Sequence, residues 1–210
     1  MTIDTEYFHQ VCINVLYGAL ALLTFVILER FIYYTLLNWR AIGLVRAVRA
    51  AGLNRQSAAL KGRDLLTRGV VDYVDALNQP GVARSRLEDL SSALFIRVSG
   101  RVGARLWILD TIVTAAPLLG LLGTILGIME TFNALSSGGI SDPAAVSRGI
   151  AAALIATAIG IGTALYGLVG HNLLHRFAAY LTEEFKGILL ASHGVADALN
   201  DDATQGAPAE

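Results

Sequence analysis

Three long apolar stretches, separated by more polar segments, dominate the pattern of hydrophobic positions along the chain. The first begins at Val11 and, with the aromatic residues that follow it, covers residues 11–37; the second covers 106–135 and the third 145–174. A helix crosses a bilayer with about 20 consecutive apolar residues. The pattern therefore predicts an all-α integral membrane protein with three transmembrane helices.

The polar residues 38–105 also show helical periodicity. Leu66, Val70 and Tyr73 recur at helical spacing opposite charged residues. The sequence Asn78-Gln-Pro-Gly81 predicts a turn that ends this helix. A second amphipathic helix follows and meets no strong helix breaker before the second apolar stretch. We therefore expect a helical hairpin outside the membrane whose second arm is continuous with transmembrane helix two.

Three shorter segments complete the chain. Residues 1–10 are polar and acidic, and residues 136–144, rich in Ser and Gly, form a short loop. Residues 175–210 begin as an amphipathic helix and end in an acidic tail. We expect this tail to be disordered from Asn200 onward, because it has too few apolar residues to form a core.

Composition and charge support a membrane protein and predict its orientation. Charged residues make up 16% of the chain, whereas a soluble domain has about 25%.

Twelve of the sixteen Lys and Arg residues lie between residues 40 and 105, and residues 1–10 contain none. Because cytoplasmic segments carry the excess of Lys and Arg, we expect the N-terminus outside the cytoplasm. The hairpin, the C-terminus and the inner ends of helices two and three then lie in the cytoplasm. The dispersed basic residues indicate contacts with membrane lipids and not with nucleic acid.

Small residues occupy regular positions in the second and third stretches, where membrane helices usually carry Leu. They include Gly123, Thr124 and Gly127 in the second stretch and Thr157 and Gly160 in the third. In lipid, helices associate through close backbone approach and hydrogen bonds, which small and hydroxylated residues permit. These two stripes indicate helices that pack on a neighbour, with a pore as one possible result.

Five residues are candidates for a functional role. Thr124 and Thr157 are either helix-packing residues that bond their own backbone or a polar ring that lets protons pass. Glu130 is either an intramembrane carboxylate with a function or a residue at the outer interface. Arg148 either pairs with Glu130 or anchors the third helix at the headgroups. Pro117 predicts a helix kink that widens the space between helices.

Other chemistry finds no support in the sequence. His171 and His175 lie four residues apart, but no Glu completes a metalloprotease motif, so we expect interfacial anchors and no metal site. The single cysteine, Cys12, fits an apolar packing position. The chain contains no phosphate-binding loop and no nucleophile elbow. We therefore expect neither an enzyme nor a bound cofactor.

The run from Thr114 to Phe132 (TAAPLLGLLGTILGIMETF) and the run from Gly149 to Gly160 (GIAAALIATAIG) resemble the ExbB/TolQ/MotA proton-channel family, ExbB most closely and TolQ next. The resemblance covers the whole chain. It implies a homopentamer in the bacterial inner membrane, with a periplasmic N-terminus, whose second and third helices line a channel. It also implies an ExbD- or TolR-like single-span partner inside that channel, a TonB- or TolA-like protein, and protons as the coupling ion.

The resemblance also assigns site residues. Thr124 and Thr157 correspond to the family's two pore-lining threonines, and the glycines listed above belong to the channel wall. Many members carry Glu five residues before the second threonine, where this chain has Ala152. Two accounts follow: the partner's Asp carries the proton alone, while Glu130 or Arg148 tunes the outer vestibule, or this member differs in conduction. We prefer the first.

The function expected from the resemblance is a proton-channel subunit, part of a motor stator, that energises TonB-dependent transport across the outer membrane. A TolQ-type subunit of the Tol-Pal envelope system is one alternative. A scaffold that stabilises its partner without conducting protons is another.

Overall fold

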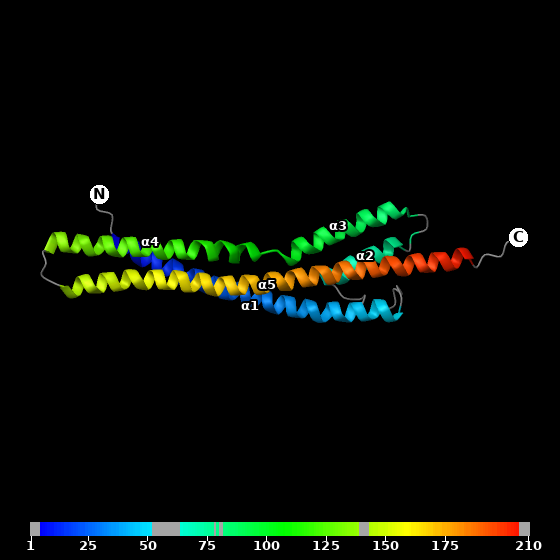
Figure 1. Ribbon diagram of the computed structural model, residues 1–210, viewed down its shortest axis with the longest axis horizontal. Coiled ribbons are helices and arrows are strands. Elements are labelled where there is room, and N and C mark those ends of the chain that lie inside the picture. Colours follow the sequence, from blue (N-terminus) through cyan, green and yellow to red (C-terminus); the bar gives the residue numbers. More distant parts are fainter. Residues whose placement is uncertain (1–4, 52–63, 78, 80–81, 139–142, 206–210) are drawn as a thin grey trace. The chain divides into compact units, whose positions relative to one another are not determined.

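The computed structural model describes residues 5–51, 64–77, 79, 82–138 and 143–205 (Figure 1). These residues form helices and connecting segments, without strands. The helices in chain order are α1 (Thr5–Ala51), α2 (Leu65–Leu77), α3 (Arg84–Val102), α4 (Leu106–Gly138) and α5 (Pro143–Gln205).

Three of these helices contain segments that are long and apolar enough to cross a membrane. The segments are Tyr7–Leu44 in α1, Leu106–Asn133 in α4 and Val146–Leu190 in α5. Their presence confirms the predicted all-α class with three candidate transmembrane helices. With 47 residues, α1 is longer than a bilayer requires, and so is α5 with 63. Both helices therefore extend beyond the hydrocarbon layer.

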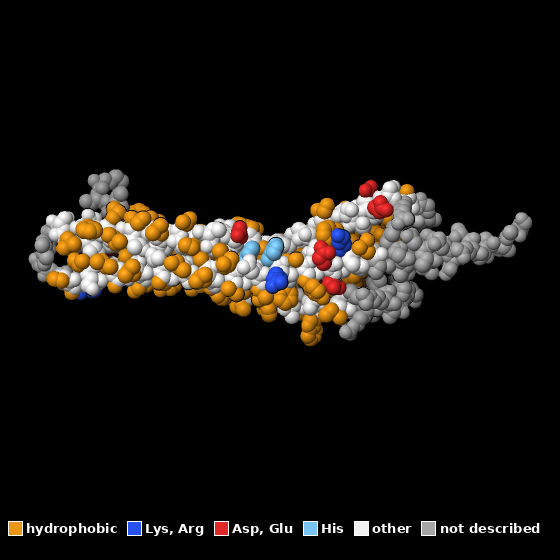
Figure 2. All heavy atoms as spheres, viewed as in Figure 1, with side chains coloured by type: hydrophobic (Ala, Val, Ile, Leu, Met, Phe, Trp, Pro, Cys, Tyr) orange, Lys and Arg blue, Asp and Glu red, His pale blue; other side chains and the backbone are white. Residues whose placement is uncertain are grey.

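The chain divides into two compact units. Unit 1 comprises residues 1–30 and 105–174, and unit 2 comprises residues 31–104 and 175–210. Hydrophobic side chains are spread all along the visible face of α4 and of the first part of α5 in unit 1, whereas several Asp, Glu, Lys and Arg side chains gather on unit 2 (Figure 2). This difference fits a unit 1 in contact with lipid or other helices and a unit 2 in contact with water.

Unit 1 is a packed set of three helix segments. Leu16 of α1, Ala116 of α4 and Ala164 of α5 form a buried cluster, against which Leu119 and Ile159 pack. Two of the three helices meet through alanine and not through a large side chain. The helices therefore approach each other closely, as the stripes of small residues predict.

Unit 2 contains the predicted hairpin, formed by α2 and α3. The apolar face of α2 is buried as its periodicity predicts, with Val70 and Tyr73 at most 2% exposed. Gly69 lets α2 approach α5, because a Cβ there would lie only 2.7 Å from Cζ of Phe185. Tyr34 of α1 donates a 2.7 Å hydrogen bond to the Val102 carbonyl at the end of α3. The core of unit 2 thus receives side chains from four helices.

The prediction that the hairpin's second arm continues into the second transmembrane helix is wrong. Helix α3 ends at Val102 and α4 begins at Leu106. The Gly103 N–H still donates to the Ser99 carbonyl at 2.9 Å, but Arg105 has a φ of 71°, a left-handed conformation that interrupts the helix. A single glycine and an arginine give little warning of such a break, because arginine is ordinarily a good helix former.

The helix ends also differ from the predicted boundaries. Helix α4 continues to Gly138, into the predicted loop 136–144, of which residues 139–142 lie outside the described residues. Helix α5 begins at Pro143 and continues to Gln205. The third apolar stretch and the amphipathic segment are therefore one helix, and the expected disorder from Asn200 is wrong for residues up to Gln205. In the predicted 78–81 turn, only residue 79 is described.

Candidate functional site

Facing glycines bring α4 and α5 into backbone contact in unit 1. A Cβ atom on Gly160 would lie 2.6 Å from the Ala116 carbonyl oxygen and 2.9 Å from the Gly120 Cα. A Cβ atom on Gly120 would lie 3.0 Å from the Ala156 carbonyl oxygen. These neighbours are backbone atoms, which cannot rotate away as a side chain can. Glycine is therefore required at both positions for this helix contact.

The same contact brings together Thr124 and Thr157, the two threonines singled out from the sequence. Their Oγ1 atoms are hydrogen-bonded to each other. Thr124 Oγ1 also lies 3.2 Å from the carbonyl oxygens of Gly120 and Ala153, and Thr157 Oγ1 lies 3.1 Å from that of Gly120. Both residues are half-buried. The result is a pair of hydroxyls, reachable from the edge of the helix contact and held by carbonyls of both helices.

This pair has more acceptor sites than protons. Each hydroxyl supplies one proton and two lone pairs. The two hydroxyl protons are used in the hydrogen bond between the hydroxyls and in hydrogen bonds to the carbonyl oxygens of Gly120 and Ala153. At least one hydroxyl lone pair then remains for a hydrogen bond from outside. The threonine pair can therefore accept a hydrogen bond from a water molecule or from a protonated carboxyl group.

The other predicted wall glycines are buried between α4 and α5 of the single chain. A Cβ atom on Gly123 would lie 2.8 Å from the Ala156 Cβ, and one on Gly127 would lie 3.0 Å from the Ala153 Cβ. Together with Gly160, they hold the two helices close enough for the threonine hydroxyls to meet. The observed role of these glycines is helix packing within one chain.

Ala152 lies on a different side of α5 from Thr157. Thr157 is five residues beyond Ala152, about 140° further around the helix. Ala152 is half-buried, and a longer side chain there would point to a different side of α5 from the Thr157 hydroxyl.

The remaining predicted residues lie apart from this pair. Glu130 is half-buried in the last turns of the apolar segment of α4, and Arg148 is exposed in the second turn of α5. No ion pair joins these two described side chains. Pro117 lies inside α4, which continues through it to Gly138. Elsewhere in unit 1, the Glu29 carboxylate forms an ion pair with Arg105, with 2.9 Å between Oε1 and Nη1.

His9 is a buried polar residue of unit 1 that the sequence analysis did not identify. It lies in the second turn of α1 and is 7% exposed. Its Nδ1 is 3.0 Å from the Gly123 carbonyl oxygen, and its Nε2 has no hydrogen-bond partner among the described residues. The spacing of His9, Cys12 and Leu16 repeats the three- and four-residue steps of a buried helix face. Extending that face toward the N-terminus would have identified His9.

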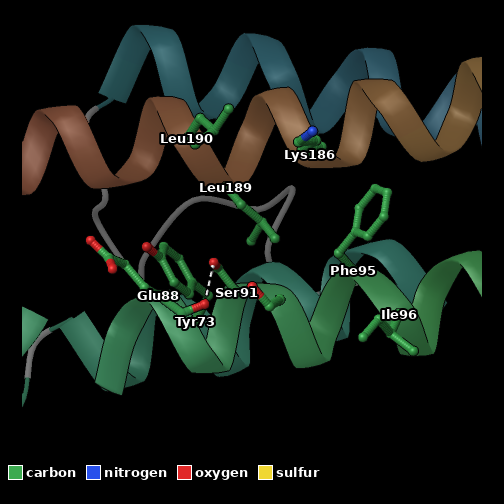
Figure 3. Close-up of a pocket in the computed structure, with 9 residues that line it drawn as sticks. Tyr73, Glu88, Ser91, Phe95, Ile96, Lys186, Leu189 and Leu190 are labelled. Atoms are coloured by element: carbon green, nitrogen blue, oxygen red, sulfur yellow. Dashed lines mark hydrogen bonds between the residues drawn. The ribbon is translucent and has the colours of Figure 1, made fainter. Parts of the chain in front are cut away.

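A pocket of about 480 Å³ lies in unit 2, between α3 and α5 (Figure 3). Phe95, Leu189 and Leu190 give it an apolar lining, and Lys186 Nζ lies 5.7 Å from the centre of the Phe95 ring. The sequence did not predict this pocket, because its lining comes from helices far apart along the chain. The described residues contain no cluster of His, Cys, Asp or Glu that could hold a metal ion.

Comparisons with known proteins agree with this architecture. The sequence model of the MotA/TolQ/ExbB proton channel family matches residues 58–186. The Tol-Pal system protein TolQ of Pseudomonas aeruginosa is 32% identical over 164 residues, which are 72% of this chain and 70% of TolQ. An ExbB homologue of Methanothermobacter thermautotrophicus is 44% identical over 82 residues, which are 39% of this chain and 29% of that protein.

Among solved structures, the MotAB structure of C. jejuni covers 90% of this chain and 70% of the matched chain, with a TM-score of 0.54 and 19% identity. This likeness supports the fold. The family match covers more than half of the chain and includes both threonines and every glycine of the α4–α5 contact. The chain is therefore a membrane protein that belongs to the MotA/TolQ/ExbB proton channel family and is not an enzyme.

Proposed function

We propose that the chain is the channel subunit of a proton-driven motor in the bacterial inner membrane, with its N-terminus in the periplasm. Five copies surround the transmembrane helix of an ExbD-like partner, and proton flow energises a TonB-like protein for transport across the outer membrane. Membership of the proton channel family and the similarity to an ExbB homologue support this proposal.

The observation that carries the proposal is the threonine pair. Thr124 and Thr157 place two hydroxyls at the edge of a contact that otherwise consists of Gly, Ala and larger apolar residues. Their spare lone pair accepts a hydrogen bond from the protonated carboxyl group of a partner helix. When the carboxyl group loses its proton, that hydrogen bond is lost, and the partner helix is free to move. The proton is thus carried by the partner, and the channel wall senses whether it is present.

The glycines contribute indirectly to this function. Gly120 and Gly160 bring the backbones together, so that Thr157 reaches the Gly120 carbonyl across the helix contact. A bulkier residue at either position would separate the helices and with them the two hydroxyls. The helix contact therefore determines the geometry of the polar site.

Substitutions at Thr157 test the proposal. We would reconstitute the chain with its ExbD-like partner in liposomes and record proton flux under an imposed gradient. Thr157→Ser keeps the hydroxyl and is expected to retain flux, whereas Thr157→Val keeps the shape, removes the hydroxyl and is expected to abolish flux. Equal flux through both variants would contradict a role for the hydroxyl.

A TolQ-type subunit is the second candidate function. It is favoured by the similarity to TolQ, which extends over 72% of this chain, more than the similarity to the ExbB homologue. Expression of the chain in strains that lack either ExbB or TolQ separates the two candidates. Restored iron-complex uptake indicates an ExbB-type role, and restored detergent resistance indicates a TolQ-type role. A chain that binds its partner but conducts no protons would be a scaffold.

A further inference from the structure

We propose that His9 is a proton-binding site within the membrane part of this chain. The inference rests on the proposed function, since it gives the channel subunit a protonatable group of its own. His9 lies outside residues 58–186, the part of the chain that the family model matches. The proposal comes from the surroundings of the imidazole ring in unit 1.

The hydrogen bond of the ring determines which nitrogen takes the proton. Nδ1 lies 3.0 Å from the Gly123 carbonyl oxygen, which can only accept a hydrogen bond. Nδ1 therefore carries the hydrogen of the neutral ring, and the lone pair is on Nε2. Nε2 is buried and has no partner among the described residues. A buried acceptor without a donor costs free energy, so the Nε2 lone pair is the place where a water molecule or another proton donor would bind.

The ring also lies against a glycine that leaves room for it. Its Cε1 would be 3.3 Å from a Cβ atom on Gly127, and the same Cβ atom would be 3.0 Å from the Ala153 Cβ. The imidazole thus fills the space at the junction of α1, α4 and α5. Any side chain larger than hydrogen at Gly127 would crowd the ring. The structure therefore holds His9 in one position and orientation.

Among the residues whose side chains the structure describes, the titratable or charged ones on the surrounding helices at this end of unit 1 are Tyr7, which is exposed, Cys12, Glu130 and Arg148. Cys12 of α1 lies one turn away and donates to the Leu119 carbonyl at 3.0 Å. Glu130 of α4 follows Gly123 by seven residues, so it lies on the same side of that helix, two turns further on. Arg148 of α5 is exposed. Glu130 is thus a carboxylate on the same side of α4 as Gly123, about 10 Å further along the helix axis.

The chemical step is a reversible proton transfer. The Nε2 lone pair takes a proton from water, the ring becomes a cation with two N–H groups, and the same proton later returns to water or to a carboxylate. No electrons are transferred. His9 and Thr124 bond to neighbouring carbonyls of the same part of α4, those of Gly123 and Gly120. Protonation of His9 therefore acts next to the threonine pair, at the end of unit 1 where α1 begins.

The first test reads the ring directly and needs no proton flux. We would label the full chain with ¹⁵N-histidine, place it in lipid nanodiscs and record the imidazole nitrogen signals over a pH series. The chain has four histidines, and the signal lost in His9→Asn identifies His9. We expect the Nδ1–H form at the high end of the pH series, converting reversibly to the doubly protonated ring as the pH is lowered. A ring with its hydrogen on Nε2, or one that never changes form, would overturn the proposal.

The second test measures the consequence for flux, with variants matched to the two nitrogens. His9→Asn keeps a donor near the position of Nδ1, and His9→Gln places an amide near that of Nε2; neither titrates. We expect both variants to lose the pH-dependent part of partner-dependent proton flux, while Cys12→Ser keeps it. An unchanged pH profile in both His9 variants would overturn the proposal. Absence of flux in the native chain would refute the proposed function instead, and the nitrogen signals would still decide the fate of His9.

Discussion

Replacing Gly160 by Ala tests whether backbone contact between α4 and α5 holds unit 1 together. The added methyl group would lie 2.6 Å from the Ala116 carbonyl oxygen and 2.9 Å from the Gly120 Cα. Both neighbours are backbone atoms, so the helices themselves must move apart. Overpacking of this kind costs about 1–3 kcal/mol, whereas Ala in place of Gly within a helix gains up to about 1 kcal/mol. With the full gain in helix propensity subtracted, we expect a net loss of up to about 2 kcal/mol in the free energy of unfolding.

The matched control is Gly162→Ala, two residues further along α5. A Cβ atom at Gly162 meets nothing within 4 Å in the chain. This variant receives the gain in helix propensity without the steric cost, so its stability should be unchanged or slightly raised. Unfolding of both variants in mixed micelles with increasing SDS, followed by circular dichroism, gives the comparison. If Gly160→Ala were as stable as the native chain, or if both variants lost stability equally, the close helix contact would not be the cause.

Unit 2 gives two further predictions. Gly69→Ala should destabilise the chain by up to about 2 kcal/mol, because its Cβ would lie 2.7 Å from the buried Phe185 ring and the gain in helix propensity offsets part of the steric cost. Gly187→Ala, with open space at its Cβ, is the control in the same unfolding assay, and equal effects of the two substitutions would contradict the reasoning. Tyr34→Phe should cost about 1 kcal/mol, because it removes the buried 2.7 Å hydrogen bond to the Val102 carbonyl. Faster exchange of the backbone amides at the end of α3 would accompany this loss, and unchanged stability would refute it.

The periodicity of apolar residues was sufficient to predict most of the fold. Stretches of about 20 apolar residues have few alternatives to a transmembrane helix, because lipid offers no partners for an unpaired backbone. The hairpin was also predictable, since α2 buries Val70 and Tyr73 on one face and Pro and Gly follow its end. The break before Leu106 was not, because it depends on the left-handed backbone of Arg105 and not on a strong breaker.

The candidate site was predictable only in part. Small residues at helical spacing indicated that Thr124 and Thr157 lie on packing faces, and the structure joins them by a hydrogen bond. The sequence did not show that α1 begins early enough to bury His9. This burial depends on the packing of three helices, which the periodicity of one helix cannot specify.

Proton flux into liposomes that contain the chain together with its ExbD-like partner is the decisive test of the proposed channel. We expect flux for the native chain with the partner, none for the chain alone, and none when the partner's intramembrane Asp is replaced by Asn. Ala152→Glu should not be needed for flux, because in the proposed function the partner's Asp carries the proton. A native chain that conducts only after Ala152→Glu, or that never conducts with its partner, would contradict the account.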